Sequence, residues 1–171
     1  MLVGQNVTLR AWRDSDLEVL TALRNDSKLQ AQLMTQPRPN STVRVRQWLS
    51  EKSSRTDGVF FIVATQKEDR AIGYVQVLNL DLLNGHGDLG ICVSPAAQGQ
   101  GYGRETLALL EVYLRRTFAL RKLMLQALAD NAGALAFYHE CGYGNAGRLT
   151  EHFYTDGRFC DVVLMEKFLS T

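Results

Sequence analysis

The sequence predicts a single α+β domain over residues 1–171, with a largely antiparallel, twisted sheet that contains one parallel strand–helix–strand crossover. Three observations predict it. Short apolar runs typical of strands outnumber the helical patterns. One strand passes through a glycine-rich loop straight into a long helix, and another strand follows that helix. No repeat, low-complexity stretch or linker divides the 171 residues, a length that suits one domain with a substantial core.

The first half of the chain should hold a strand, two helices and two more strands, each identified by its own local signal. Alternation predicts strands, a capping box predicts a helix start, and proline predicts a break. In order, these elements are a strand at 2–12, a helix opened by the capping box at 15–18, a second helix capped by Ser41 or Thr42 after the breaks at Pro37 and Pro39, and strands at 59–65 and 71–80.

The second half should contain the crossover and a closing hairpin. The unit 87–129 predicts a right-handed parallel crossover inside the otherwise antiparallel sheet. Gly142 is placed to end a short helix as its C′ residue. The expected elements are a strand at 87–93, a helix from the glycine loop to about Phe118, a strand at 123–129, a helix at 131–141, and strands at 148–154 and 159–168 joined by the hairpin signal Thr155-Asp156-Gly157-Arg158.

The glycine-rich segment 98–104 reads Gln-Gly-Gln-Gly-Tyr-Gly-Arg and is the most informative part of the chain. A strand that turns through glycines into a helix presents free backbone N–H groups at the positive end of the helix, which favours an anion such as phosphate. A Walker loop is excluded because Arg104-Glu105 stands where Lys-Ser/Thr is needed. The dinucleotide fingerprint is also excluded, since Arg104 occupies its last glycine position.

Composition favours a globular protein of a reducing compartment. Hydrophobic residues make up 46% of the chain, charged residues 22%, and the net charge is +1, without the basic excess of a nucleic-acid-binding protein. Three cysteines without a CxxC pair argue against a disulfide framework and a metal site. The chain shows no signal-peptide pattern and no apolar run long enough to cross a bilayer. We therefore expect a cytoplasmic protein that binds no nucleic acid, membrane or metal.

Two motifs together resemble the general-control-type N-acetyltransferase (GNAT) superfamily. The loop 98–104 resembles the family's coenzyme A loop, Arg/Gln-x-x-Gly-x-Gly/Ala. Asn131-x-x-Ala134-x-x-Phe137-Tyr138, followed by Gly142-Tyr143, resembles the motif N-x-x-A-x-x-[FL]-Y-x-x-x-G-[FY]. The resemblance covers nearly the whole chain. It implies the GNAT fold, whose central strands splay apart to bind acetyl-CoA.

The resemblance also implies which residues bind acetyl-CoA as co-substrate. The backbone near Val93 would pair with pantetheine, the loop would hold the pyrophosphate, and Asn131 and Tyr138 would line the far side of the gap. The implied binding set is Val93, Gln98, Gly99, Gln100, Gly101, Tyr102, Gly103, Arg104, Asn131 and Tyr138.

The acceptor is expected to be a small-molecule primary amine. The closing segment, with Arg148, Tyr154, Asp156, Gly157, Asp161 and Met165, resembles the subgroup of ribosomal-protein-alanine, spermidine and amino-sugar N-acetyltransferases. The runs 23–25 and 85–91 most resemble nucleotide-linked amino-sugar acetyltransferases of the pseudaminic acid pathway, and this is the preferred acceptor class. A protein N-terminal amine and a polyamine are alternatives, although the neighbouring loop 82–85 is not acidic, as a polyamine site should be. Arg24, Asn25 and His86 are the candidate acceptor-binding residues.

Acetyl transfer from a thioester needs a neutral amine, hydrogen-bond donors for the oxyanion and support for the departing thiolate. Asp88 is the candidate base, with a salt bridge to an arginine as its structural alternative and His86 as a rival base. Tyr138 is the candidate acid, with helix packing as its alternative. Cys92 is expected to be a small buried hydrophobe rather than a nucleophile. A coenzyme A-binding module without catalysis is the alternative from another class, and the sequence leaves a homodimer open.

Overall fold

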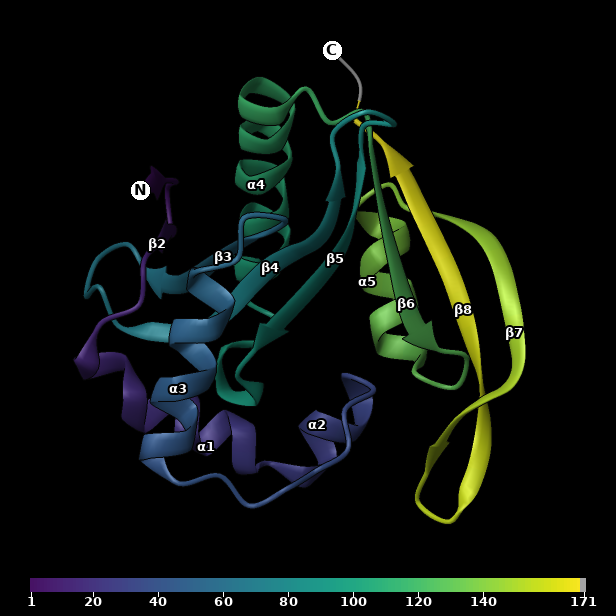
Figure 1. Ribbon diagram of the computed structural model, residues 1–171, viewed down its shortest axis with the longest axis horizontal. Coiled ribbons are helices and arrows are strands. Elements are labelled where there is room, and N and C mark those ends of the chain that lie inside the picture. The colour runs from purple at the N-terminus through teal and green to yellow at the C-terminus, as the bar shows by residue number, and fades with distance from the viewer. Residues whose placement is uncertain (170–171) are drawn as a thin grey trace.

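Eight strands and five α-helices make up residues 1–169, the part of the chain described by the structure, a computed structural model (Figure 1). In chain order the elements are β1 Leu2–Val3, β2 Val7–Arg10, a 3₁₀ turn at Asp14–Asp16, α1 Leu17–Asn25, α2 Ser27–Gln32, α3 Thr42–Ser53, β3 Val59–Thr65, β4 Ala71–Asp81, β5 His86–Val93, a 3₁₀ turn at Pro95–Ala97, α4 Tyr102–Phe118, β6 Lys122–Leu128, α5 Ala132–Glu140, β7 Gly144–Thr155 and β8 Arg158–Phe168.

All strands join one sheet in the order β1-β2-β3-β4-β5-β6-β8-β7. Every neighbouring pair is antiparallel except β5 and β6, which are the two ends of the crossover through α4. The predicted α+β class and the single parallel crossover are therefore confirmed.

Helices cover both faces of the sheet, α4 and α5 on one face and α1, α2 and α3 on the other (Figure 1). Leu107, Leu110 and Leu114 of α4 are at most 1% exposed and pack against one face of the sheet, as their helical spacing predicts. Leu20, Leu23 and Leu49 belong to a second core on the opposite face. Side chains of β5 alternate between these cores, with Leu89 in the first and Cys92 in the second.

The two central strands separate after a short paired stretch. β5 and β6 are in register only from His86 to Asp88, opposite Lys122 to Met124. Beyond this point β5 stays paired with β4 up to Val93, while β6 stays paired with β8 as far as Leu128. The sheet thus divides into two halves, and the facing main-chain edges of β5 and β6 are left unpaired between them. The expected splayed strands are confirmed.

The N-terminal elements differ from the prediction in two ways. The expected single strand at 2–12 is divided into β1 and β2 by a turn closed by a 2.9 Å bond from Gly4 N to Val7 O. The expected capping box at 15–18 was also wrong. Asp16 rather than Glu18 accepts a backbone bond, from Arg13 N at 2.8 Å, and pairs with the buried guanidinium of Arg10. This charge pair, at most 4% exposed on either side, fixes Asp16 inside the helix start.

Helix α2 was missed, although its N-cap is visible in the sequence. The Asp26 side chain accepts a 3.0 Å bond from Leu29 N, a standard capping contact. The next helix begins as predicted, since Ser41 caps α3 through Arg44 N at 3.2 Å. The predicted closing hairpin is also present, because Asp156 and Gly157 both have positive φ, as a two-residue hairpin turn requires.

Candidate active site

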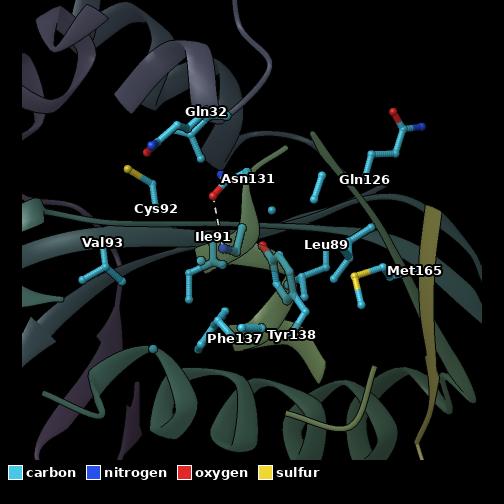
Figure 2. A pocket seen from close by; sticks show the side chains of 18 of the residues that line it. Gln32, Leu89, Ile91, Cys92, Val93, Gln126, Asn131, Phe137, Tyr138 and Met165 are labelled. Carbon is cyan, nitrogen blue, oxygen red and sulfur yellow. Dashed lines mark hydrogen bonds between the residues drawn. The ribbon is translucent and has the colours of Figure 1, made fainter. Parts of the chain in front are cut away.

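A cleft of about 1460 Å³ opens where β5 and β6 separate. Its walls come from segments far apart in the chain: α2 and the residues after it, β4, β5, the glycine loop, β6, α5 and β8. Figure 2 shows Leu89, Ile91 and Val93 of β5 along the cleft, with Phe137 and Tyr138 of α5 below them and Gln32 of α2 on the opposite side. Nine of the ten residues implied to bind acetyl-CoA line this cleft, and Gln100 is the exception.

The glycines of the loop have two different structural roles. Gly99 and Gly101 have φ values of 74° and 83°, which favour glycine, and a Cβ at either position would meet nothing within 4 Å. Gly103 lies inside α4, where a Cβ would approach the Phe137 ring to 3.1 Å. The third glycine therefore lets α5 pack closely on α4, while the first two shape the turn.

The N-terminus of α4 supplies an anion-binding geometry. Glu105 N makes the first bond of the helix, to Gly101 O at 3.1 Å, so the N–H groups before it have no partner inside the helix. Arg104 lines the cleft at this end, where its guanidinium pairs with Glu140 of α5 at 2.7 Å. Gln98 donates to Val93 O at 3.0 Å and thereby ties the loop to the end of β5.

Asn131 and Tyr138 are positioned by the helix that follows β6. Asn131 caps α5, because its side-chain oxygen Oδ1 accepts a 3.1 Å hydrogen bond from Ala134 N. The NH₂ group of the same side chain takes no part in this bond. Tyr138 is 8% exposed, and burial raises its pKa to about 12. Its hydroxyl points toward the middle of the pocket (Figure 2). The tyrosine is therefore a neutral hydrogen-bond donor whose ring is packed in the core.

Asp88 lines the cleft from the face of the sheet that α1 to α3 cover, the face to which Cys92 belongs. Its carboxylate accepts a 2.8 Å bond from Asn79 Nδ2, so the partner in this structure is a neutral amide rather than the arginine considered above. Asp88 and Tyr138 approach the cleft from opposite faces of the sheet. This placement allows one carboxylate to meet an acceptor on one side while the hydroxyl meets the thioester on the other.

The sequence analysis missed the other half of the cleft. Leu29, Gln32, Leu33 and Met34 line it from α2 and the residues that follow, Gln76 from β4, and Glu166 from β8. The Asp26 cap could have revealed α2, but no local signal places Gln76 or Glu166 on the same face of the cleft as Asp88. The loop 82–85 contributes nothing to the lining, so its lack of acidic residues carries no information about the acceptor.

The three candidate acceptor-binding residues, Arg24, Asn25 and His86, lie outside the lining of the cleft. Arg24 stacks on Trp48, with Cζ 4.6 Å from the ring centroid. Asn25 bonds main-chain atoms of Thr21 and Asn40 and so holds the segment before α3. His86 stands at the start of β5 with Nε2 3.8 Å from an Asp81 carboxylate oxygen. Their assignment to the acceptor stays a prediction, and Asp88 is better placed as base than His86.

Cys92 lines the cleft but is unsuited to nucleophilic catalysis. The residue is 1% exposed, and burial raises the pKa of its thiol to about 12. The thiolate, which is the reactive form, is therefore scarce at neutral pH. This agrees with the expectation that Cys92 is a small buried hydrophobe.

Neither a metal-binding cluster nor a membrane-spanning helix is found within residues 1–169. The described residues hold no group of three or more His, Cys, Asp and Glu side chains arranged for a metal ion. No helix in the same range is long and apolar enough to cross a membrane. A reaction without metal and a cytoplasmic localisation stay predictions.

The chain is similar in sequence and in fold to spermidine N-acetyltransferases. The chain is 24% identical over 172 residues to the spermidine N(1)-acetyltransferase of Vibrio cholerae, and the match covers 98% of each chain. A structure of the V. cholerae spermidine N-acetyltransferase with CoA and spermine matches with a TM-score of 0.86 and 24% identity over 95% of both chains. A dodecameric structure of that enzyme, 24% identical, matches with a TM-score of 0.76 over 96% of this chain and 94% of that chain.

The model of the acetyltransferase (GNAT) domain family matches residues 6–144, which include the glycine loop, both splayed strands and α5. The fold, the cleft between β5 and β6 and the family match all indicate the same family. The chain belongs to the GNAT acetyltransferase family and is an acetyl-CoA-dependent N-acetyltransferase.

Proposed function

We propose that this enzyme transfers the acetyl group of acetyl-CoA to a primary amine of a polyamine. The observation that carries the proposal is the Asp88 carboxylate on the acceptor side of the cleft, whose hydrogen-bond partner Asn79 is neutral. Glu166 of β8 lies in the same cross-strand row, each residue opposite Met124 of β6, but its carboxylate is paired with Lys122 Nζ at 2.9 Å. The negative charge of Asp88, which forms no ion pair with a described residue, favours a cationic acceptor and repels the phosphates of a nucleotide-linked sugar.

The spermidine acetyltransferases among the relatives support the same class of acceptor. They favour the polyamine, an alternative in the sequence analysis, over the amino sugar that was preferred there. The dodecameric relative also supports self-association of this chain, beyond the homodimer that the sequence left open. Light scattering of the purified protein measures its mass in solution and tests that point.

In the proposed reaction, coenzyme A lies along the splayed edge of β5 with its pyrophosphate at the start of α4. The amine enters from the opposite face and loses its proton to Asp88, directly or through water. The neutral nitrogen attacks the thioester carbonyl, and the C–S bond breaks as the tetrahedral intermediate collapses, with the Tyr138 hydroxyl donating a hydrogen bond to the departing thiolate. The second proton of the nitrogen passes through water to the thiolate, and Asp88 returns the first proton to solvent. The products are free coenzyme A and the N-acetylated amine.

A thiol-release assay with acetyl-CoA tests the acceptor class directly. We expect kcat/KM to be highest for polyamines such as spermidine and spermine. A nucleotide-linked amino sugar and a peptide with an N-terminal alanine are the comparison substrates. Higher kcat/KM for either of them than for every polyamine would overturn the polyamine proposal, while leaving the acetyltransferase activity itself in place.

The role of Asp88 predicts a pH-dependent defect in Asp88→Asn. An alkyl amine has a pKa of about 10.4, so at neutral pH the acceptor arrives mostly as ammonium and needs a base. We expect kcat/KM to fall about tenfold near pH 7, below the usual 10²–10⁴ range because water can replace part of the function in an open cleft. The defect should shrink as the pH approaches the pKa of the amine. Parallel pH profiles for variant and wild type would assign Asp88 a structural role.

A further inference from the structure

Gln76 of β4 presents an unexplained polar group beside the candidate base. Its side chain lines the cleft, yet its amide oxygen Oε1 is buried and has no hydrogen-bond partner among the described residues. A buried amide oxygen without a partner destabilises a folded protein, since the oxygen has lost its water. A buried amide oxygen that has no partner and lies in the lining of a candidate active site is a candidate for binding a ligand.

The register of the sheet places Gln76 next to Asp88. Gln76 is directly opposite Gly90 on β5, and the next pair along the same face is Leu78 with Asp88. Diagonal neighbours of this kind lie roughly 7–8 Å apart between Cα atoms, within reach of a long side chain. Gln76 and Asp88 therefore face the acceptor side of the cleft together.

Gly90 provides the space in which the Gln76 side chain lies. A Cβ on Gly90 would be 3.3 Å from Gln76 Nε2, 3.5 Å from its Cγ and 3.9 Å from its Cδ. Gly90 is not among the residues with positive φ, so its backbone conformation does not require glycine. The missing side chain instead allows the amide of Gln76 to extend across β5.

We propose that Gln76 is an acceptor-binding residue whose amide hydrogen-bonds the reacting nitrogen and orients its lone pair toward the thioester. The inference rests on the proposed N-acetylation of a primary amine. The terminal torsion of a glutamine is soft, so the amide can turn its oxygen toward an incoming N–H. A neutral amide suits this position because a second carboxylate would hold the acceptor as ammonium and oppose its deprotonation by Asp88.

Substitution by methionine separates ligand binding from a structural role. Gln76→Met keeps the length of the side chain and removes both polar atoms. We expect KM for the amine to rise about five- to tenfold, the effect of one lost hydrogen bond, with KM for acetyl-CoA unchanged. The melting temperature should stay the same or rise, because a buried group without a partner has been removed.

Two further variants make the test specific. Gly90→Ala should raise KM for the amine in the same direction but by a smaller factor, because the new methyl group displaces the Gln76 amide. Gln66→Met is the matched control. It changes an exposed glutamine in the turn between β3 and β4, outside the cleft, and should alter neither KM nor the melting temperature.

The assay uses the amine that wild-type enzyme acetylates fastest, so a failure of the polyamine proposal does not prevent the test. Unchanged KM for the amine in Gln76→Met would overturn the assignment. A fall of several degrees in melting temperature, with amine and acetyl-CoA affected equally, would overturn it too, since that is the signature of a glutamine that serves only the fold.

Discussion

Replacing Tyr138 by phenylalanine is expected to lower kcat about 10²-fold while acetyl-CoA affinity barely changes. Burial raises the pKa of the tyrosine to about 12, whereas a thiol has a pKa of about 8.5. Full proton transfer to the departing sulfur would therefore cost about 5 kcal/mol, at about 1.4 kcal/mol for each pKa unit. The hydroxyl instead donates a hydrogen bond that strengthens as thiolate charge develops, and such an interaction belongs to the transition state. Steady-state kinetics of Tyr138→Phe measure the effect.

Packing is the competing explanation for Tyr138, because its ring contacts Phe137 and Tyr143 in the core. The phenylalanine variant keeps the ring, so packing alone predicts wild-type turnover. Tyr138→Ala is the control for packing and should melt at a lower temperature whether or not the hydroxyl acts in catalysis. A kcat for Tyr138→Phe within about twofold of wild type, with chemistry shown to limit the rate, would remove the catalytic role.

Gly101→Val should weaken acetyl-CoA binding by about 10²-fold or more. Gly101 precedes the first residue of α4 with φ of 83°, a conformation that valine adopts only under strain. Relief of that strain would turn away the N–H groups proposed to hold the pyrophosphate, and the new side chain would project into the open space beside the loop. Two charge-assisted hydrogen bonds of about 1.5–3 kcal/mol each are enough to account for the loss. Calorimetric titration with acetyl-CoA measures it.

The hairpin between β7 and β8 offers a matched control for the strain. Gly157 has φ of 78° and open space around its missing Cβ, as Gly101 does, but lies outside the cleft. Gly157→Val should therefore lose comparable stability and retain its affinity for acetyl-CoA. Near-native affinity in a folded Gly101→Val protein would show that the loop does not hold the pyrophosphate.

The residues proposed to bind coenzyme A could be identified from the sequence because their signals are local. The loop 98–104 and the residues from Asn131 to Tyr138 each lie within one strand–loop–helix or one helix, and turn chemistry and helical spacing fix their geometry. For one glycine of the loop, the structure shows a role that the loop pattern does not indicate. A Cβ at Gly103 would approach the Phe137 ring to 3.1 Å, so this glycine allows the close contact between α4 and α5.

The acceptor half could not be predicted because it is assembled by packing. Gln76, Asp88 and Glu166 come from three strands and are brought to one face of the sheet only by the register of β4, β5, β6 and β8. A polar residue inside a strand pattern shows which face it occupies, but not what lies opposite. The same limit explains Asp16, whose partner Arg10 precedes it in a different element: the capping contact falls on Arg13 and Asp16 instead of residues 15–18, and Asp16 is buried with Arg10.

The central claim is that acetyl passes directly from coenzyme A in the cleft to an amine. Mass spectrometry of protein and small molecules after one turnover tests it. The protein should remain unmodified, and each coenzyme A released should match one N-acetylated amine, because the Cys92 thiol stays protonated and Asp88 and Tyr138 serve a direct attack. An acetylated Cys92 formed before the amine is added would contradict direct transfer. Bound acetyl-CoA that yields no acetylated amine with any acceptor would contradict catalysis by this cleft.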